Sequence, residues 1–178
     1  MSGFFKNLVE SLSLSLGHKD ERVVEALKRL PICEEMTAAE IQTLGTSCYL
    51  RKFKTQELIY TEGSPSAATY FVVSGSVGLY KKRRSQQTDR VQYIPRGKFF
   101  GDAAFYANTD RKTSAKALED TQTIVLFKSD FETLVRKHPA LAIKVLLKLT
   151  HKVYNDLVVF QTEFHELSQK MAKDELLK

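Results

Sequence analysis

The chain has 178 residues, of which 43% are hydrophobic and 27% are charged, and its net charge is +6 at pH 7. These values are typical of one globular domain that buries a core, with room for a helical extension. No stretch approaches the roughly 18 consecutive apolar residues that a membrane span needs. Two cysteines without metal-binding spacing, Cys33 and Cys48, favour a reduced, cytoplasmic setting over a disulfide framework.

Residues 1–48 have helical patterns and form the first of three predicted zones. Apolar residues between Phe4 and Leu16 recur mostly at spacings of three and four, which indicates a short amphipathic helix rather than a secretory signal. We expect this helix to pack on the domain or on a partner protein, and peripheral contact with a membrane is the alternative. Further along, Thr37 and Glu40 form a capping box that predicts the start of another helix.

Residues 49–128 change character, because short apolar runs alternate there with glycine-bearing turns. The runs at 70–73 and 77–80 flank Gly75, which predicts a tight hairpin turn. Many short strands with closely spaced turn signals indicate an antiparallel sandwich or barrel. We therefore predict an α+β fold: a small antiparallel jelly-roll β-barrel flanked by N-terminal helices and a long C-terminal helix.

Residues 129–178 are helical again, with one long helix predicted from about residue 140 towards 177. Apolar residues on this helix alternate at spacings of four and three, which is the seam of a coiled coil. The seam consists of Leu146, Thr150, Val153, Leu157, Phe160, Phe164, Leu167 and Met171. A parallel homodimer is the simplest way to bury it, and a single helix folded back on its own domain is the alternative.

One compact segment, residues 99–115, combines a glycine, an acid, a short apolar turn and an arginine. Gly101 allows close approach of the backbone, and Asp102 opens the turn. The guanidinium of Arg111 offers paired donors that suit two oxygens of one phosphate. The segment therefore predicts a phosphate-binding site, whereas a turn glycine, a helix-capping acid and a solvated arginine are the structural alternative.

This pattern resembles the phosphate-binding cassette of the cyclic nucleotide-binding domain family, in which Phe-Gly-Glu and a short loop precede an arginine. With the hairpin around Gly75 and the flanking helices, the resemblance covers roughly residues 30–160. It implies a jelly-roll barrel in which Arg111 pairs with the exocyclic phosphate of a cyclic nucleotide. The backbone N–H groups of Ala103 and Ala104 would face the same phosphate.

Two positions depart from the pattern of the family. Asp102 stands where the family has a glutamate that accepts a hydrogen bond from the ribose 2′-hydroxyl, and aspartate is one methylene shorter. Lys112 stands where cGMP-selective relatives have a threonine that contacts guanine, so the resemblance favours cAMP over cGMP. Thr113 and Ser114 are expected to line the ligand pocket, with Val73 as a further wall.

The resemblance thus implies a stand-alone regulatory module that binds cAMP and signals by contact with an effector protein. No winged helix-turn-helix follows the long helix, so we expect no DNA-binding domain. Residues 49–128 contain neither His nor Cys, which argues against a metal-dependent enzyme, and we expect neither catalytic residues nor a metal site. Asp102 and Lys112 favour the alternative, a ligand-free dimeric scaffold or adaptor that has lost nucleotide binding.

Overall fold

The computed structural model describes residues 21–83, 87–105 and 109–176, with side chains up to residue 171. The chain divides into two compact units, Met1–Phe131 and Glu132–Lys178. The amphipathic helix predicted between Phe4 and Leu16 lies outside the described residues.

Short helices precede the first strand: α2 (Glu21–Lys28), the 3-10 turn η1 (Pro31–Cys33) and α3 (Ala38–Gly45). The capping box predicted at the start of α3 is confirmed. The backbone N–H of Thr37 donates to Oε2 of Glu40 at 2.8 Å, and that of Glu40 donates to Oγ1 of Thr37 at 3.2 Å. These two bonds satisfy donors that the first turn of a helix leaves without partners.

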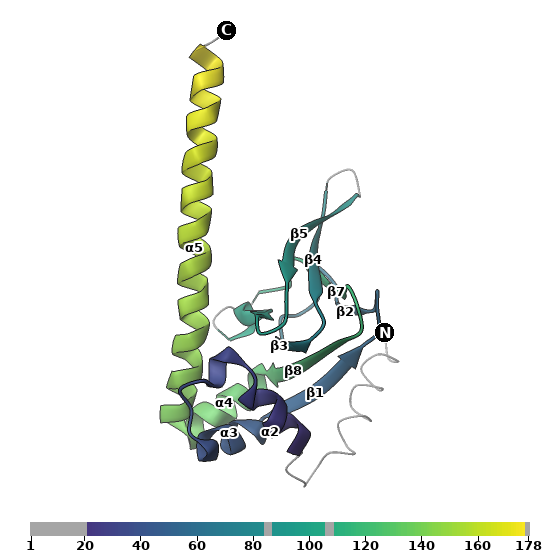
Figure 1. Ribbon diagram of the computed structural model, residues 1–178, viewed down its shortest axis with the longest axis vertical. Helices are drawn as coiled ribbons and strands as arrows, with labels where there is room; N and C mark the ends of the chain where they lie inside the picture. The colour runs from purple at the N-terminus through teal and green to yellow at the C-terminus, as the bar shows by residue number, and fades with distance from the viewer. Residues whose placement is uncertain (1–20, 84–86, 106–108, 177–178) are drawn as a thin grey trace. The chain divides into compact units, whose positions relative to one another are not determined.

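The described residues form eight strands in two four-stranded antiparallel sheets (Figure 1). The strands are β1 (Cys48–Phe53), β2 (Leu58–Tyr60), β3 (Ala68–Ser74), β4 (Val77–Lys82), β5 (Thr88–Ile94), β6 (Phe99–Phe100), β7 (Ser114–Ala117) and β8 (Thr121–Phe127). One sheet has the order β1-β8-β3-β6 and the other the order β2-β7-β4-β5. The predicted antiparallel roll with helices is confirmed, but it consists of two sheets and not of a closed barrel.

The two sheets share one hydrophobic core, because buried side chains from both contact one another. The core cluster comprises Ile59, Val72, Val77, Leu79, Ile94, Phe100 and Ala115. Valine, isoleucine and phenylalanine suit the half-buried pleated surface of such sheets.

The turn at Gly75 is tight, as predicted, but it does not join a hairpin. β3 pairs with β6 and β8, whereas β4 pairs with β5 and β7, so the chain crosses from one sheet to the other at this turn. Gly75 has φ of 78°, and a Cβ there would lie 2.5 Å from Oγ1 of Thr121. Glycine is required because the turn needs a positive φ and lies directly against another residue.

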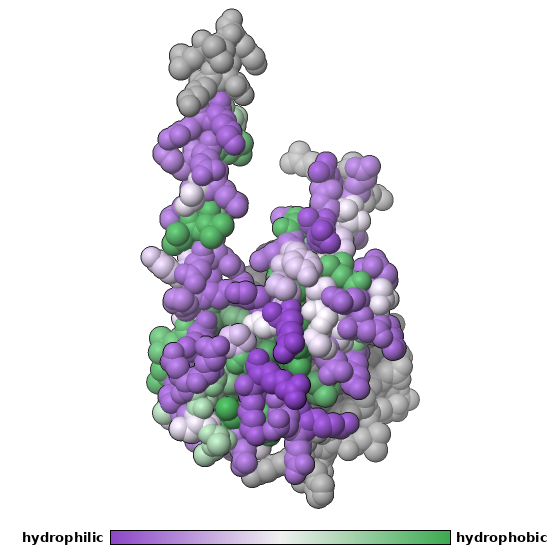
Figure 2. All heavy atoms as spheres, in the orientation of Figure 1, coloured by the Kyte–Doolittle hydropathy of each residue, from purple (hydrophilic) through white to green (hydrophobic). Residues whose placement is uncertain are grey.

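The second unit is helical. It contains most of α4 (Lys128–Lys137), which begins in the first unit, and all of α5 (Pro139–Leu176). The long helix predicted from the heptad pattern is confirmed, and hydrophobic side chains (green) are visible along it between polar ones (Figure 2). Its rings of Phe160 and Phe164 stack with centroids 6.2 Å apart. Among the described helices, none is long and apolar enough to span a membrane.

Candidate phosphate-binding site

The predicted cassette starts where β6 ends, at a left-handed turn. Gly101 has φ of 77° and precedes the 3-10 turn η2 (Asp102–Ala104). The carbonyl oxygen of Gly101 accepts three hydrogen bonds: from the N–H of Ala104 at 3.2 Å, from Oγ1 of Thr69 at 3.3 Å and from Nη1 of Arg111 at 3.1 Å. This carbonyl therefore ties the turn to β3 and to the arginine at the end of the cassette.

Arg111 is buried, with 6% of its surface exposed. Besides its bond to Gly101, its Nη2 donates to the carbonyl oxygen of Ala68 at 2.6 Å. Both acceptors are neutral backbone groups. The Nε donor is buried and has no hydrogen-bond partner among the described residues. A buried donor without a partner costs free energy, so this edge of the guanidinium favours an added acceptor.

Gly101 is the residue that leaves room for the guanidinium. A Cβ at this position would lie 2.5 Å from Nη1 of Arg111 and 3.0 Å from the carbonyl oxygen of Ala68. Both atoms take part in the hydrogen bonds that hold the arginine. The glycine and the arginine of the motif are therefore interdependent, which the sequence pattern alone does not reveal.

An aromatic cluster beside the arginine was missed by the sequence analysis. Cζ of Arg111 lies 4.2 Å from the ring centroid of Tyr60 and 5.8 Å from that of Tyr70. The rings of Tyr70 and Phe100 stack at 5.1 Å. The register that places Tyr70 opposite Phe100 in adjacent strands brings these rings together, and no local sequence signal marks that pairing.

The two tyrosines lie in an apolar environment that disfavours their charged forms. Burial raises the pKa of Tyr60 to about 12, although the Arg111 charge and a hydrogen bond with Thr113 act in the opposite direction. Burial also raises the pKa of Tyr70, again against the effect of Arg111. Both hydroxyls therefore stay neutral at physiological pH, and the cluster offers Arg111 rings rather than an anion.

The other predicted site residues of the cassette lie close in the chain but differ in exposure. Asp102 and Ala103 are half-buried and Ala104 is buried, with its N–H engaged within the turn. Lys112 is exposed. Of the two hydroxyl residues that follow it, Thr113 bonds Tyr60, and Oγ of Ser114 accepts the N–H of Glu62 at 2.9 Å.

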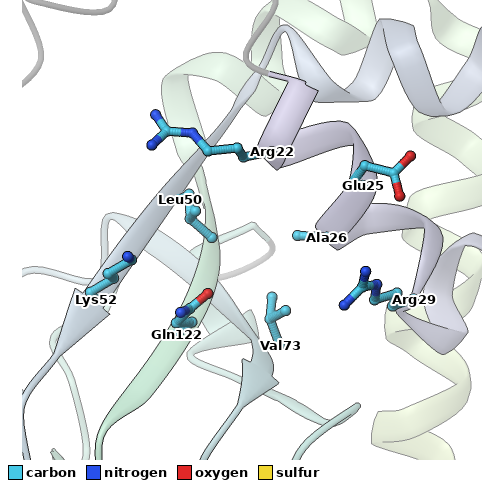
Figure 3. A pocket seen from close by; sticks show the side chains of 8 residues that line it. All are labelled: Arg22, Glu25, Ala26, Arg29, Leu50, Lys52, Val73 and Gln122. Carbon is cyan, nitrogen blue, oxygen red and sulfur yellow. The ribbon is translucent and has the colours of Figure 1, made fainter.

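Val73 does not join the cassette. Its neighbour Val72 belongs to the core between the sheets, and Val73 itself lies at an irregularity of the β3–β8 register between Val72 and Ser74. Val73 instead lines a hollow with Gln122 of β8 and with Arg29, which directly follows α2 (Figure 3). The prediction treated the end of β3 as a wall of the ligand pocket, but this side chain lines the hollow beside α2 instead.

Comparison with known proteins identifies the family to which the chain belongs. The model of the cyclic nucleotide-binding domain matches residues 50–138, which include the whole cassette and both sheets except for the first two residues of β1. The chain belongs to the cyclic nucleotide-binding domain family. The two departures predicted from the sequence, Asp102 and Lys112, are thus departures within a member of this family.

Relatives in the family are diverse. The chain is 27% identical over 148 residues to the cyclic AMP receptor protein of Thermus thermophilus, which covers 82% of this chain and 68% of the relative. It is 27% identical over 109 residues to a cAMP-dependent protein kinase regulatory subunit of Hypocrea atroviridis, covering 61% of this chain and 22% of the subunit. The chain therefore spans about two thirds of the first relative and less than a quarter of the second.

Solved structures agree on the fold. A cyclic nucleotide-binding domain from Methylobacillus flagellatus superposes with a TM-score of 0.66 at 19% identity, covering 79% of this chain and 83% of that one. The catabolite activator protein of Thermus thermophilus gives a TM-score of 0.62 at 25% identity, covering 75% of this chain and 63% of that one. Within the described part of the chain, no group of three or more His, Cys, Asp or Glu could hold a metal ion.

Proposed function

We propose that the chain is a regulatory module that binds a cyclic nucleotide at the cassette, cAMP in preference to cGMP. The observation that carries the proposal is the buried guanidinium of Arg111, whose Nε donor lacks a partner among the described residues. A phosphate oxygen placed there would satisfy this donor and neutralise the charge. Charge-assisted hydrogen bonds of this kind contribute about 1.5–3 kcal/mol each.

Preorganisation supports the same role. Two carbonyl oxygens and the Tyr60 ring already fix the guanidinium, so a ligand would not have to order a flexible side chain. The ordering cost of such a side chain is about 0.5–1.5 kcal/mol. The other side of the site is the half-buried Asp102, which we assign to the ribose 2′-hydroxyl, directly or through a water.

The preference for cAMP rests on two observations. Lys112 directly follows Arg111, so the threonine that would contact guanine is missing from that position. The relatives described above are named for cAMP, as the cyclic AMP receptor protein and as the regulatory subunit of a cAMP-dependent kinase. Both observations point to the same nucleotide.

A ring contact supports signalling by contact with an effector protein. Phe105, the residue directly after η2, stacks on Phe131 of α4 with centroids 4.5 Å apart. A ligand that binds one arrangement of the cassette better than another would change this contact and so bias α4. The altered surface would then be recognised by the effector.

For α5 we propose a second copy of the chain as partner, in a parallel coiled coil. Seven seam residues between Leu146 and Met171 are exposed large apolar side chains, from 37% at Leu146 to 62% at Phe160. Their alternation at spacings of three and four makes a narrow stripe, which suits another helix with the same stripe.

The rival function is a ligand-free adaptor built on the same fold. It is favoured by the existing bonds of Arg111 to protein atoms and by the two departures at Asp102 and Lys112. In that case the arginine would serve only to hold the turn at Gly101 to β3.

Calorimetric titration with cAMP and cGMP separates the two functions. We expect wild-type protein to bind cAMP more tightly than cGMP, Arg111→Gln to lose binding, and Arg111→Lys to weaken it at least about tenfold because lysine lacks the paired donors. Arg96→Gln is the matched control, because it removes an arginine at an exposed turn and should leave binding unchanged.

A further variant keeps the test decisive even if the arginine variants fail to fold. Asp102→Glu restores the longer acid and should tighten cAMP binding, with no gain for 2′-deoxy-cAMP, which lacks the hydroxyl. Absence of heat and of thermal stabilisation with either nucleotide, in both wild type and Asp102→Glu, would contradict the proposal and favour the adaptor.

A further inference from the structure

The hollow that Val73 lines in the first unit contains no residue of the cassette and lies on the outer face of the β1-β8-β3 sheet beside α2 (Figure 3). Its volume is about 270 Å³. The apolar part of its lining comes from Ala26 of α2, Leu50 of β1 and Val73 of β3. None of the residues that line this hollow belongs to the core cluster of the roll, so the hollow is separate from that core.

Cations surround this apolar floor. Arg22 lines it from α2, Arg29 from the turn that directly follows α2, and Lys52 from β1. Gln122, opposite Lys52 in the β1–β8 register, adds an amide that can donate a hydrogen bond. In Figure 3 the guanidinium of Arg29 reaches from the end of α2 over the hollow towards Val73.

The acid at the rim does not cancel this charge. The Glu25 carboxylate accepts a hydrogen bond from Nζ of Lys28 at 2.6 Å, and in Figure 3 it is turned away from the hollow. Arg29 and Lys52 therefore bring two positive charges to the lining, and the one carboxylate at its rim is already bound by Lys28. The local field favours an anion.

A neighbouring hollow of about 260 Å³ limits where the anionic group could lie. It shares Lys52 and Gln122 with the first hollow and also contains Asp120. Asp120 binds Lys54 at 2.9 Å and the hydroxyl and N–H of Thr55. A second anion would be repelled beside this carboxylate, so the anionic group belongs on the Arg29 side.

We propose that the hollow under α2 binds a small organic anion, whose phosphate or carboxylate group lies between Arg29 and Lys52 and whose apolar body covers Leu50 and Val73. The volume is below the 300–1,000 Å³ that is usual for drug-sized ligands, which restricts the ligand to a small molecule. The site lies outside the cassette and does not depend on the proposed nucleotide function.

Titration of the full chain with four probes tests the proposal. Phenyl phosphate and benzoate combine an anion with an apolar ring, inorganic phosphate lacks the ring, and benzyl alcohol lacks the charge. We expect phenyl phosphate and benzoate to bind and to shift the methyl resonances of Leu50 and Val73 through the ring current, with inorganic phosphate and benzyl alcohol binding at least about tenfold more weakly.

Variants locate the binding. Arg29→Gln and Lys52→Gln should each weaken phenyl phosphate binding about tenfold, since each loses a charge-assisted hydrogen bond. Lys81→Gln removes one positive charge from an exposed position on β4 and should change nothing.

Three results would overturn the proposal. An equal effect of Lys81→Gln, or equal binding of inorganic phosphate, would indicate a diffuse response of a basic surface to anions. Loss of phenyl phosphate binding in Arg111→Gln, with Arg29→Gln unaffected, would place the ligand in the cassette instead. Retained binding in Arg111→Gln supports the separate site even if cAMP fails to bind.

Discussion

Arg111 is both a structural link and the centre of the candidate site. Its backbone N–H donates to the carbonyl oxygen of Ser64, and its own carbonyl accepts the N–H of Gly63. Its guanidinium bonds Ala68 and Gly101 at the same time. One residue thus holds together the loop before β3 and the turn after β6, so removal of its side chain should cost stability as well as ligand binding.

Gly101→Ala should therefore destabilise the protein more than alanine does at an ordinary glycine with a positive φ. A positive φ alone costs a non-glycine residue about 1–2 kcal/mol. At Gly101 the added Cβ would also displace Nη1 of Arg111, which lies 2.5 Å away. Gly63→Ala is the matched control, because Gly63 has φ of 81° and no atom within 4 Å of the added Cβ.

Urea denaturation and cAMP titration of both variants check this prediction. Gly63→Ala should lose only the stability that the positive φ costs an alanine, and it should still bind cAMP. Gly101→Ala should lose more stability and should also lose cAMP binding. Equal losses of stability in the two variants would mean that the close approach to Arg111 is unimportant.

Because of Tyr60, the stability of the folded protein should decrease at alkaline pH. Its pKa is raised by burial from 10.0 to about 12, so between these values the tyrosine is ionised in the unfolded chain and neutral in the folded one. The contribution of the neutral, buried Tyr60 to the stability of the folded protein is complete below pH 10 and is lost as pH rises towards 12. The free energy of unfolding should fall by up to about 1.4 kcal/mol per pH unit for this residue.

Denaturant titrations on either side of pH 10 measure this slope. Tyr60→Phe should flatten it, while Tyr93→Phe, a change at an exposed side chain, should leave it as in the wild type. An unchanged slope in Tyr60→Phe would show that the hydroxyl is not buried.

Elements set by local signals are the ones that the sequence could predict. The capping box at Thr37, the long helix and the glycine turns depend on neighbouring residues, and all appear as expected. The assignment of strands to two sheets at Gly75 and the outward direction of Val73 depend on register between distant strands. The cluster of Tyr60, Tyr70 and Arg111 needs the same tertiary information.

The capping box of α3 allows a test at the scale of a single helix. Thr37→Ala removes the acceptor for the Glu40 N–H and should lower the free energy of unfolding by about 1 kcal/mol. Thr43→Ala, inside the same helix, removes only a hydroxyl that donates to the carbonyl of Ala39. Because alanine favours helix, this control should stay within about 0.5 kcal/mol of wild type. Comparable urea midpoints for the two variants would contradict the role of the cap.

At the scale of the whole molecule, α5 has many large apolar side chains that are exposed in the single chain. Large apolar residues rarely form an extended exposed stripe on a monomer. The seam residues from Leu157 to Met171 recur with the period of a coiled coil. Lys170 is the only lysine or arginine between them, whereas a helix that lies on a membrane surface is rich in basic residues on its polar face. In the proposed dimer, a second copy of α5 would bury this stripe without any other component.

Sedimentation of the full chain over a range of concentrations tests the proposed dimer. Wild-type protein should be dimeric, and Phe164→Glu should be monomeric, because the substitution puts facing carboxylates into the seam. Val159→Glu is the control: Val159 is exposed to 55%, much like Phe164 at 61%, but it lies off the 3–4 stripe between Leu157 and Phe160. If both variants dissociate, or if wild type is a monomer throughout, the seam is not the contact between two copies. Dissociation of Phe164→Glu alone would support the seam and its register together, because the two substitutions add the same charge to the same helix.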